Sequence, residues 1–368
     1  MTLRIAFDHQ AFVMQSYGGV SRYYTRLTLA LVRAKIDAQI FAPLHKNFYL
    51  SELTPNITNG KYFKKFPPKT ASLVNFYNSS KLNKSILHFK PDILHETYYR
   101  GNKNRSANQP VVITVYDMIH ELLPEFFPAH DLTARYKHEA VNRADHIICI
   151  SNSAKNDLIQ IYNIPENKVS VVHLASDISI SSNLNILSID YTKPFILFVG
   201  QRSGYKNFHN FITSIALSPR LKMNFNIVCF GGGSFTSEET KQLHSLGFDN
   251  NQVIQTAGDD RLLSELYSSA RAFVFPSRYE GFGLPLLEAM SNGCPVICSN
   301  VSSLPEVAGD AASYFDPNNI EEMSKVIEDV VFSDFSISEL KRLGFSRSNM
   351  YSWDLCAEKT VAIYNNLL

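Results

Sequence analysis

Short apolar runs alternate with amphipathic stretches from one end of the chain to the other. In the first half, runs rich in Val, Ile and Phe predict strands at residues 4–7, 38–42, 92–96, 111–116, 146–150 and 169–174. Such runs are apolar at successive positions, which is typical of parallel strands buried between two layers of helices. The amphipathic stretches between them predict helices at about 20–34, 131–143 and 153–161.

The alternation stops between residues 174 and 193, where the chain is polar, rich in serine and without periodicity, which predicts a linker. It then resumes, with strands predicted at residues 195–199, 226–230, 253–256, 272–275 and 296–298. Helices are predicted at about 207–217, 237–246, 260–270, 284–292 and 319–332, and an amphipathic helix from 353 to 367 ends the pattern.

This pattern predicts the α/β class, with two doubly wound domains in tandem. The first domain is expected at residues 1–175, the linker at 176–193 and the second domain at 194–351, followed by a terminal helix at 352–368. Sheets of this kind bind ligands beyond the carboxyl ends of their strands, near helix N-termini. We expect the two domains to face each other across a cleft that holds the chemistry.

Composition agrees with two ordinary globular domains. The chain has 368 residues, with 35 Lys and Arg against 34 Asp and Glu, so it lacks the global positive charge of a nucleic-acid-binding protein. No apolar run reaches the roughly 18 residues of a transmembrane helix, and we expect no secretory signal at the N-terminus. The five cysteines are scattered in apolar segments, which favours buried thiols in a reducing cytoplasm over disulfides or a metal cluster.

Charge is nevertheless uneven along the chain. Between residues 46 and 105, eleven Lys or Arg stand against three acidic residues, which gives this stretch a net charge of +8. Aromatic residues interleave with the lysines at 61–66. The basic region 61–105 is therefore a candidate for peripheral contact with the anionic inner face of the plasma membrane. A solvated face beside the cleft explains the same pattern.

The segment 275–290 carries the most specific pattern in the chain. It leaves a predicted strand, turns through Gly281 and Gly283, and enters a helix with Pro285 in the first turn, where proline is tolerated. Glycines let backbone amides approach a ligand closely, and amides at a helix N-terminus favour an anion. Glu280 lies on the loop and Glu288 in the helix. Each carboxylate can accept charge-assisted hydrogen bonds from sugar hydroxyls.

This segment resembles the Glu-x7-Glu signature of the retaining, nucleotide-sugar-dependent group 1 glycosyltransferases of the GT-B fold. The resemblance extends over nearly the full length: residues 18–23, 144–153, 199–207, 295–297 and 304–307 and the helix from Trp353 are all similar to segments of that family. It implies two Rossmann-like domains, the first for the acceptor and the second for the donor. It also implies that the terminal helix packs back on the first domain.

The resemblance implies roles for individual residues. Glu280 corresponds to the glutamate that contacts the donor sugar, and Glu288 to the one that binds the ribose hydroxyls. Arg202 and Lys206 correspond to cations that neutralise the donor diphosphate, where fixed positive charge stabilises a leaving group. We expect backbone amides of seven residues at the donor: Gly18, Gly19, Gly232, Gly281, Phe282, Gly283 and Leu284. For Gly18 and Gly19, the acceptor is the alternative ligand.

The end of the strand at 111–116 departs from the family pattern. Many members have a His, often followed by Asp, directly after this strand, whereas this chain has Tyr116 and Asp117. Asp117 is our candidate for a polar group near the reacting centre, either as a base or as a ligand of the sugar or acceptor. His120 and Tyr116 are weaker candidates for the acceptor site, and a structural role explains His120 as well.

The sequence also indicates which cofactors to expect. No Asp-x-Asp pair occurs to hold a divalent cation on a diphosphate, and the glycines at 231–233 do not extend into a G-x-G-x-x-G. We therefore expect neither a metal nor a bound cofactor. A nucleoside diphosphate sugar enters as substrate, with Arg202, Lys206 and helix dipoles in place of the ion.

The sequence thus predicts transfer of a hexosyl group from a nucleoside diphosphate sugar to a hydroxyl of a polysaccharide or lipid-linked oligosaccharide, with retention at the anomeric carbon. The overall pattern favours a mannosyl group from GDP-mannose, as in bacterial O-antigen and capsule mannosyltransferases, while UDP- and dTDP-sugars stay open. Two alternatives remain. One is a GT-B nucleotide-sugar epimerase or hydrolase, and the other is a non-catalytic subunit that binds a sugar nucleotide.

Overall fold

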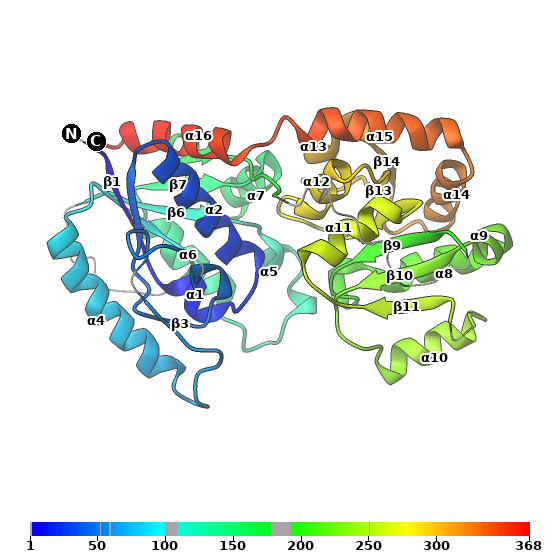
Figure 1. The fold of residues 1–368 in the computed structure, drawn as a ribbon, viewed down its shortest axis with the longest axis horizontal. Coiled ribbons are helices and arrows are strands. Elements are labelled where there is room, and N and C mark those ends of the chain that lie inside the picture. Colours follow the sequence, from blue (N-terminus) through cyan, green and yellow to red (C-terminus); the bar gives the residue numbers. More distant parts are fainter. Residues whose placement is uncertain (1, 52, 59, 100–108, 178–192, 250) are drawn as a thin grey trace. The chain divides into compact units, whose positions relative to one another are not determined.

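The computed structural model describes residues 2–51, 53–58, 60–99, 109–177, 193–249 and 251–368. The chain divides into two compact units, the first formed by Met1–Leu174 with Ser352–Leu368 and the second by Ala175–Tyr351. Each unit is a parallel sheet covered by helices (Figure 1), which confirms the predicted α/β class. The predicted linker at 176–193 lies almost entirely outside the described residues.

Unit 1 is built on a parallel sheet with the strand order β2-β1-β5-β6-β7-β8. These strands are β1 (Arg4–Phe7), β2 (Asp37–Ile40), β5 (Ile93–Glu96), β6 (Val111–Val115), β7 (His146–Cys149) and β8 (Val169–Val171). A separate parallel pair is formed by β3 (Leu44–His45) and β4 (Lys61–Tyr62). The helices are α1 (Gln10–Met14), α2 (Gly19–Arg33), α3 (Phe48–Ser51), α4 (Ala71–Phe89), α5 (Ile119–Leu122), α6 (Thr133–Arg143), α7 (Asn152–Tyr162) and α16 (Trp353–Asn365), with 3-10 turns at Pro124–Phe126 and Glu166–Lys168.

Unit 2 repeats the architecture with the strand order β11-β10-β9-β12-β13-β14. Its strands are β9 (Phe195–Val199), β10 (Asn226–Phe230), β11 (Val253–Thr256), β12 (Ala272–Phe275), β13 (Val296–Ser299) and β14 (Ala312–Phe315). Its helices are α8 (Phe208–Leu217), α9 (Pro219–Asn224), α10 (Ser237–Ser245), α11 (Asp260–Ser269), α12 (Leu284–Ser291), α13 (Leu304–Ala308), α14 (Ile320–Val331) and α15 (Asp334–Ser348). Short 3-10 turns occur at Gly204–Lys206 and Gly309–Ala311.

Both units reverse the direction in which the sheet is wound next to their first strand. In unit 2 the chain proceeds from β9 outward through β10 to β11, then crosses to the other side of β9 and proceeds through β12 to β14. Unit 1 reverses in the same way between β1 and β5. Sheets wound in this way bind their ligands at the carboxyl edge next to the reversal, where the loops that follow the two strands leave in opposite directions.

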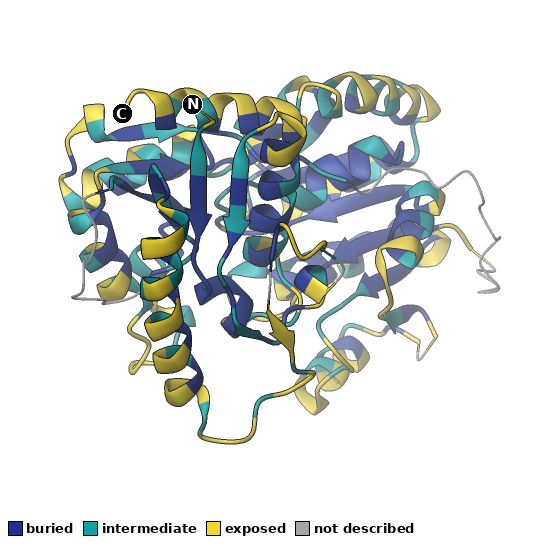
Figure 2. Ribbon diagram, turned by 60° about the vertical axis from the view of Figure 1, so that its left-hand side comes forward, coloured by how far each residue is buried: buried dark blue, intermediate teal, exposed yellow. Residues whose placement is uncertain are grey.

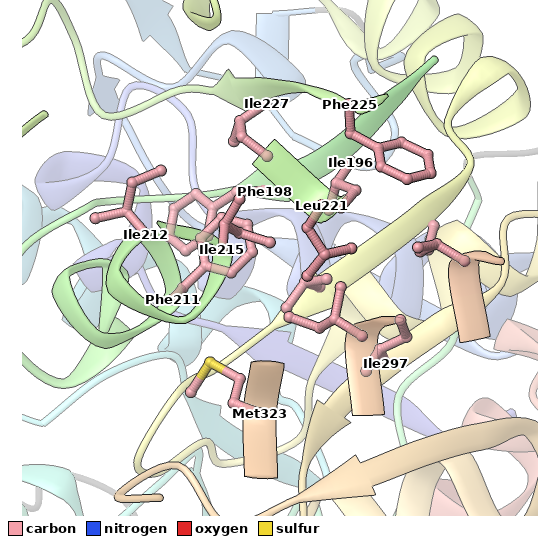
Figure 3. Close-up of a cluster of buried hydrophobic side chains, with 14 of the residues drawn as sticks. Ile196, Phe198, Phe211, Ile212, Ile215, Leu221, Phe225, Ile227, Ile297 and Met323 are labelled. Atoms are coloured by element: carbon pink, nitrogen blue, oxygen red, sulfur yellow. The ribbon is translucent and has the colours of Figure 1, made fainter. Parts of the chain in front are cut away.

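The core of unit 2 lies between its sheet and the helices α8, α9 and α14. Figure 3 shows Phe198 of β9, Phe211 of α8 and Met323 of α14 within one cluster of buried apolar side chains. The rings of Phe198 and Phe208 lie 5.2 Å apart and meet edge to face, an arrangement that aromatic pairs favour. Burial of each such side chain contributes about 1.5–3 kcal/mol, so this cluster fixes β9 and its loop relative to α8.

Among the elements that the sequence pattern did not predict, α4, α15 and β14 have a clear physical reason. The helix α4 carries apolar side chains on its outer face as well as its inner one, for example Phe76 outside and Val74 inside, so no single stripe marks it. The helix α15 contains Gly344, which lies so close to α12 that a Cβ there would be 3.2 Å from the Met290 side chain. The edge strand β14 is short and partly exposed.

A buried polar network joins the terminal helix α16 to the sheet of unit 1. Helix α16 packs against α2, and Tyr364 of α16 places its hydroxyl 2.6 Å from Nδ1 of His95. Nε2 of the same ring lies 2.9 Å from the Thr114 hydroxyl on β6. Burial lowers the pKa of His95 to about 3. The imidazole is therefore neutral at ordinary pH and bridges the terminal helix to the middle of the sheet.

No helix within the described residues is both long and apolar enough to cross a membrane. All five cysteines are buried and carry free thiols.

Acidification is expected to destabilise unit 1 through His95. The unfolded chain takes up a proton near pH 6.5, whereas the folded ring does not until about pH 3. Between these values the unfolded state binds more protons, so the free energy of unfolding falls as the pH falls, by up to about 1.4 kcal/mol per pH unit. Trp353 is the single tryptophan of the chain and lies in α16, so its fluorescence in urea follows unit 1.

A control is needed because the neighbouring Glu96 also changes the stability of unit 1 with pH. Burial raises the pKa of the Glu96 carboxyl to about 7, although Arg143 opposes this, and such a group stabilises the folded state as the pH falls. The free energy of unfolding is therefore compared between the wild type and His95→Gln at each pH. His95→Gln should be less stable at pH 7 but lose less stability between pH 6.5 and 5 than the wild type, and parallel pH profiles would contradict the assignment.

Candidate functional site

The loops after β9 and β12 leave unit 2 at the reversal of the sheet, and each carries a charged residue that the sequence analysis selected. Lys206 ends the 3-10 turn after β9, and Glu280 lies in the loop between β12 and α12. The ammonium Nζ of Lys206 lies 2.6 Å from Oε1 of Glu280. Both side chains are mostly buried, so the pair is a charge-assisted hydrogen bond of low exposure.

The main chain of Glu280 is fixed from the loop after β13. Its N–H donates to the Ser302 hydroxyl at 2.9 Å, and the Ser303 hydroxyl donates to its carbonyl at 2.8 Å. Nothing in the sequence marked these serines as functional, although they directly precede the family-like segment at 304–307. They hold the loop in place while leaving the carboxylate directed at Lys206.

Lys206 is held by the residue that follows it. Asn207 has φ +61, a left-handed conformation that Asn tolerates better than most residues. Its side-chain Nδ2 donates to the carbonyls of Pro276 and Pro317 at 3.1 and 2.8 Å. In addition, the N–H of Arg278 donates to the Tyr205 carbonyl at 2.8 Å. The loops after β9 and β12 are therefore tied together by hydrogen bonds around the ion pair.

The start of α12 has the geometry that the glycines suggested. Gly283 caps the helix at φ +96, and a Cβ at this position would lie 2.9 Å from the Leu304 side chain. The ring of Phe282 is buried 5.9 Å from that of Tyr351 and so faces the interior of unit 2. The Phe282 side chain is therefore turned away from the helix N-terminus, where main-chain amides and the helix dipole favour an anion.

Glu288 lies further along α12 and is buried. The Tyr267 hydroxyl of α11 lies 3.4 Å from its Oε2, and the Asn292 side chain donates to its carbonyl at 2.7 Å. Its carboxylate therefore faces α11, while Glu280 faces the loop after β9. The two glutamates of the motif occupy separate environments, as their spacing indicated.

Arg202 is placed differently from Lys206. Sequence analysis assigned it to the donor diphosphate, but the structure buries its guanidinium against the loop after β10. It donates to the carbonyls of Gly231, Gly233 and Ser234 at 3.0, 2.9 and 3.1 Å, and it pairs with Glu239 of α10 at 2.8 Å. Its side chain is only 2% exposed. This arrangement favours a role in shaping the glycine loop over direct contact with a ligand.

Gly232 is required by this same packing. All three glycines at 231–233 have positive φ, and a Cβ on Gly232 would lie 2.8 Å from Nη1 of Arg202. Carbonyls of the loop turn towards the arginine, which determines the course of the main chain after β10. The loop and Arg202 therefore form one unit.

The glycine pair of unit 1 lies at the start of α2. The Ser21 N–H donates to the side-chain Oε1 of Gln15 at 3.1 Å, so Gln15 caps the helix. A Cβ on Gly18 would collide with this side chain at 2.4 Å, whereas Gly19 borders open space. Gly18 is therefore explained by the cap.

A buried lysine organises the loop after β6, and the sequence analysis missed it. Lys137 of α6 is fully buried and donates to the Asp117 carbonyl at 2.8 Å and to Oε2 of Glu121 at 2.8 Å. Its Nζ lies 3.8 Å from Oδ1 of Asp117, whose side chain is 33% exposed. A lysine on an amphipathic helix is usually solvated, so the sequence offered no signal for this position. Asp117 is thus held beside a buried cation with part of its carboxylate accessible.

Tyr116 and His120 are held by packing and polar contacts within unit 1. Tyr116 is buried, its N–H donates to the Tyr99 hydroxyl at 3.1 Å, and burial raises its pKa. The His120 ring stacks on Phe127 at 3.9 Å and lies 3.7 Å from Asp131. Burial lowers the pKa of His120, and the nearby Lys137 adds to this shift. Of Tyr116, Asp117 and His120, Asp117 has the most exposed side chain and is therefore the best placed to contact a ligand.

Comparisons with known proteins match both halves of the chain to glycosyltransferases. The family model "Glycosyl transferases group 1" matches residues 180–343, and "Glycosyltransferase Family 4" matches residues 17–179. The O-antigen chain mannosyltransferase B of Escherichia coli is 31% identical over 267 residues, which is 70% of each chain. The serotype-specific mannosyltransferase WbdA of Escherichia coli is 31% identical over 242 residues, but this match spans only 29% of that protein. The solved sucrose-phosphate synthase of Thermosynechococcus elongatus superimposes with a TM-score of 0.79 over 99% of each chain, at 18% identity.

Removal of the Arg202 guanidinium should destabilise unit 2. Arg202→Met would leave the carboxylate of Glu239, whose side chain is 18% exposed, and several loop carbonyls without their donor. Breaking a buried pair from one side costs about 3–5 kcal/mol. We expect a corresponding fall in the unfolding temperature of unit 2 in differential scanning calorimetry.

Arg342→Met is the matched control. Arg342 pairs with Glu339 at 2.6 Å, but both side chains are largely exposed, and exposed pairs contribute little. The control should unfold at the wild-type temperature. Equal unfolding temperatures for all three proteins would show that the buried pair does not stabilise the loop.

Proposed function

This chain belongs to the group 1 glycosyltransferases of the GT-B fold, and on that premise we propose that it transfers a mannosyl group from GDP-mannose to a hydroxyl of a glycan or lipid-linked oligosaccharide. The reaction proceeds with retention at the anomeric carbon. The observation that carries the proposal is the pair of Lys206 and Glu280, 2.6 Å apart at the reversal of the unit 2 sheet.

The ion pair has the chemistry that such a transfer requires. An ammonium offers three donors, so Lys206 can bind a phosphate oxygen of the donor while it still holds Glu280. Glu280 in turn has acceptor positions for sugar hydroxyls. A cation and a carboxylate fixed side by side can therefore position the diphosphate and the sugar of one donor molecule.

Further parts of the donor fit the neighbouring elements. The N-terminus of α12, from Gly281 to Leu284, is suited to the diphosphate because main-chain amides and the helix dipole favour an anion. Glu288 is suited to the ribose, since a carboxylate accepts from two vicinal hydroxyls. The loop at 231–234 that Arg202 holds would border the same crevice from the β10 side.

In the proposed step the bond between the anomeric carbon and the diphosphate oxygen breaks while the acceptor oxygen bonds to that carbon from the same face. The acceptor hydroxyl proton passes to the leaving diphosphate, so charge and atoms balance. Negative charge develops on the leaving group, where Lys206 stabilises it. Asp117 is proposed to bind a hydroxyl of the acceptor or sugar. The proposed step uses no divalent cation.

The choice of donor and acceptor rests on the relatives. Both Escherichia coli relatives are mannosyltransferases, and one of them is an O-antigen chain mannosyltransferase. Their identity to this chain is 31% in each case, which supports a mannosyl donor and a surface-glycan acceptor. We propose that the enzyme works in the cytoplasm at the inner face of the plasma membrane, where lipid-linked glycans are exposed.

Loss of either member of the ion pair should abolish most transfer while the fold survives. We expect Glu280→Ala and Lys206→Ala each to lower kcat by at least about a hundredfold, the scale on which an electrostatic contact in a transition state operates. The measurement is the formation of mannosylated acceptor from GDP-mannose, with the anomeric configuration of the product read by NMR.

Asp334→Ala is the matched control because Asp334 also forms an ion pair in unit 2, with Arg271 at 2.7 Å, but is 94% exposed. Its kcat should equal that of the wild type. Wild-type turnover in either ion-pair variant would remove that residue from the mechanism. Consumption of donor without product on any acceptor would instead favour the epimerase or hydrolase.

The nucleotide base can be identified by thermal shift. A ligand that binds only the folded state raises its stability by RT ln(1 + [L]/Kd), about 2.7 kcal/mol at one hundred times Kd. We expect GDP and GDP-mannose to raise the unfolding temperature of unit 2, and UDP, dTDP and their sugars to leave it unchanged. A selective shift with UDP or dTDP would replace the guanine assignment.

A further inference from the structure

The helix α4 exposes large apolar side chains along its outer face. Leu73, Phe76 and Leu87 are 69%, 75% and 73% exposed, and Tyr77 joins them at 44%. These positions follow one another at helical spacing, since 73, 76, 77, 80, 84 and 87 fall on one side of a helix with 3.6 residues per turn. Figure 2 shows the exposed residues of α4 on the side away from the sheet.

The inner face of α4 is anchored to unit 1, so the outer face has a fixed orientation. Val74, Leu82 and Ile86 are buried at helical spacing on the opposite side. Between them, Asn78 forms two hydrogen bonds to Leu44, accepting from its N–H at 2.9 Å and donating to its carbonyl at 2.8 Å. Because the inner face is buried, the apolar outer face stays exposed in the folded unit.

The segment that contains this apolar face is basic. No acidic residue occurs between positions 53 and 91, whereas the segment holds seven lysines. All seven are exposed: Lys61, Lys64, Lys65, Lys69, Lys81, Lys84 and Lys90. Lys84 lies within the outer face of α4, and the ammonium of Lys81 lies 5.6 Å from the Tyr77 ring.

We propose that the outer face of α4, with the lysines around it, is the surface by which this protein docks on a membrane that contains anionic lipids. The helix spans 19 residues, or about 28 Å at 1.5 Å per residue, and would lie in the plane of the interface. Its Leu and Phe side chains would enter the boundary between head groups and acyl chains while the lysines contact lipid phosphates. The proposal refines the membrane location given under Proposed function and rests on it.

Charge complementarity selects this occupant over a solvated surface or a second copy of the chain. A face that only needs solubility would not carry several large apolar side chains at 69–75% exposure, because contiguous exposed apolar surface marks an interaction site. A second copy would bring another set of lysines and no acidic partners to this face. An anionic lipid surface satisfies both the apolar and the basic groups.

Vesicle sedimentation tests the proposal on the full chain. Wild-type protein should bind vesicles of phosphatidylcholine with 30% phosphatidylglycerol and release at high salt, and should bind pure phosphatidylcholine far more weakly. The vesicle composition of about 30% is a choice that gives a strongly negative surface. Equal binding to both vesicles, or no binding to the anionic ones, would overturn the proposal.

Two sets of variants address the two components of the surface. Leu73→Ser, Phe76→Ser and Leu87→Ser combined should abolish vesicle binding. Lys81→Gln with Lys84→Gln should weaken the partition coefficient by about thirtyfold, since each lysine near an anionic surface contributes about fivefold. All of these side chains are exposed, so the unfolding midpoint from Trp353 fluorescence should match the wild type. Wild-type binding by the triple variant would refute the role of α4.

Matched controls come from unit 2. Leu217→Ser, Met223→Ser and Phe335→Ser combined remove side chains that are 51%, 68% and 80% exposed, and Lys241→Gln with Lys325→Gln removes two exposed lysines. Both controls should bind vesicles as the wild type does. If the controls lost binding to the same extent as the α4 variants, the effect would reflect general surface chemistry and the proposal would fail.

Two further measurements distinguish membrane docking from the proposed transfer activity and from self-association. Transfer to a water-soluble acceptor without vesicles should be unchanged in the α4 variants, whereas inactive wild-type protein that still binds anionic vesicles would reject the proposed function and keep the docking surface. Size-exclusion chromatography checks for self-association. A wild-type dimer that the Leu73, Phe76 and Leu87 variant converts to a monomer would assign this face to a second copy and overturn the proposal.

Discussion

The reversal of winding direction beside β9 is the constraint on which the candidate site depends. Parallel strands are buried on both faces, so their side chains are apolar and chemistry is confined to the loops at the carboxyl edge. The reversal brings the loops after β9 and β12 to one point of that edge. Lys206 and Glu280 meet there at 2.6 Å, although 74 positions separate them in the chain. Neither residue would contact the other if β12 were added beside β11.

Charges buried away from that edge have a different role. Arg202 and Lys137 are almost fully buried. Arg202 is surrounded by loop carbonyls and the Glu239 carboxylate, and Lys137 by the Asp117 carbonyl and the carboxylates of Glu121 and Asp117. A buried charge is strongly unfavourable unless such partners surround it. These cations therefore hold loops in one conformation, the glycine loop at 231–234 in one unit and the loop of Asp117 in the other. Family resemblance alone would have given Arg202 the same role as Lys206.

The sequence predicted much of the framework because its signals are local. Strand positions in both units, the turn at Gly283 and the charged residues of the loops follow from apolar runs, glycines and motif spacing. Signals fail where neighbours decide the outcome. Helix α4 has apolar residues on two faces, of which one is buried within unit 1 and the other is exposed, and no periodicity reveals which is which. The same holds for α15, whose Gly344 is explained only by the closeness of α12.

The sequence by itself thus determined the class of the fold, the alternation of most of its strands and helices and the identity of the loop residues, since each depends on residues close together in the chain. Only the tertiary structure decided that Lys206 pairs with Glu280 while Arg202 turns away to the glycine loop. It alone also decided that Lys137 is buried and that Phe76 is not. The direction of a long side chain depends on partners that the fold brings from distant positions, and these partners are set by the packing of whole elements.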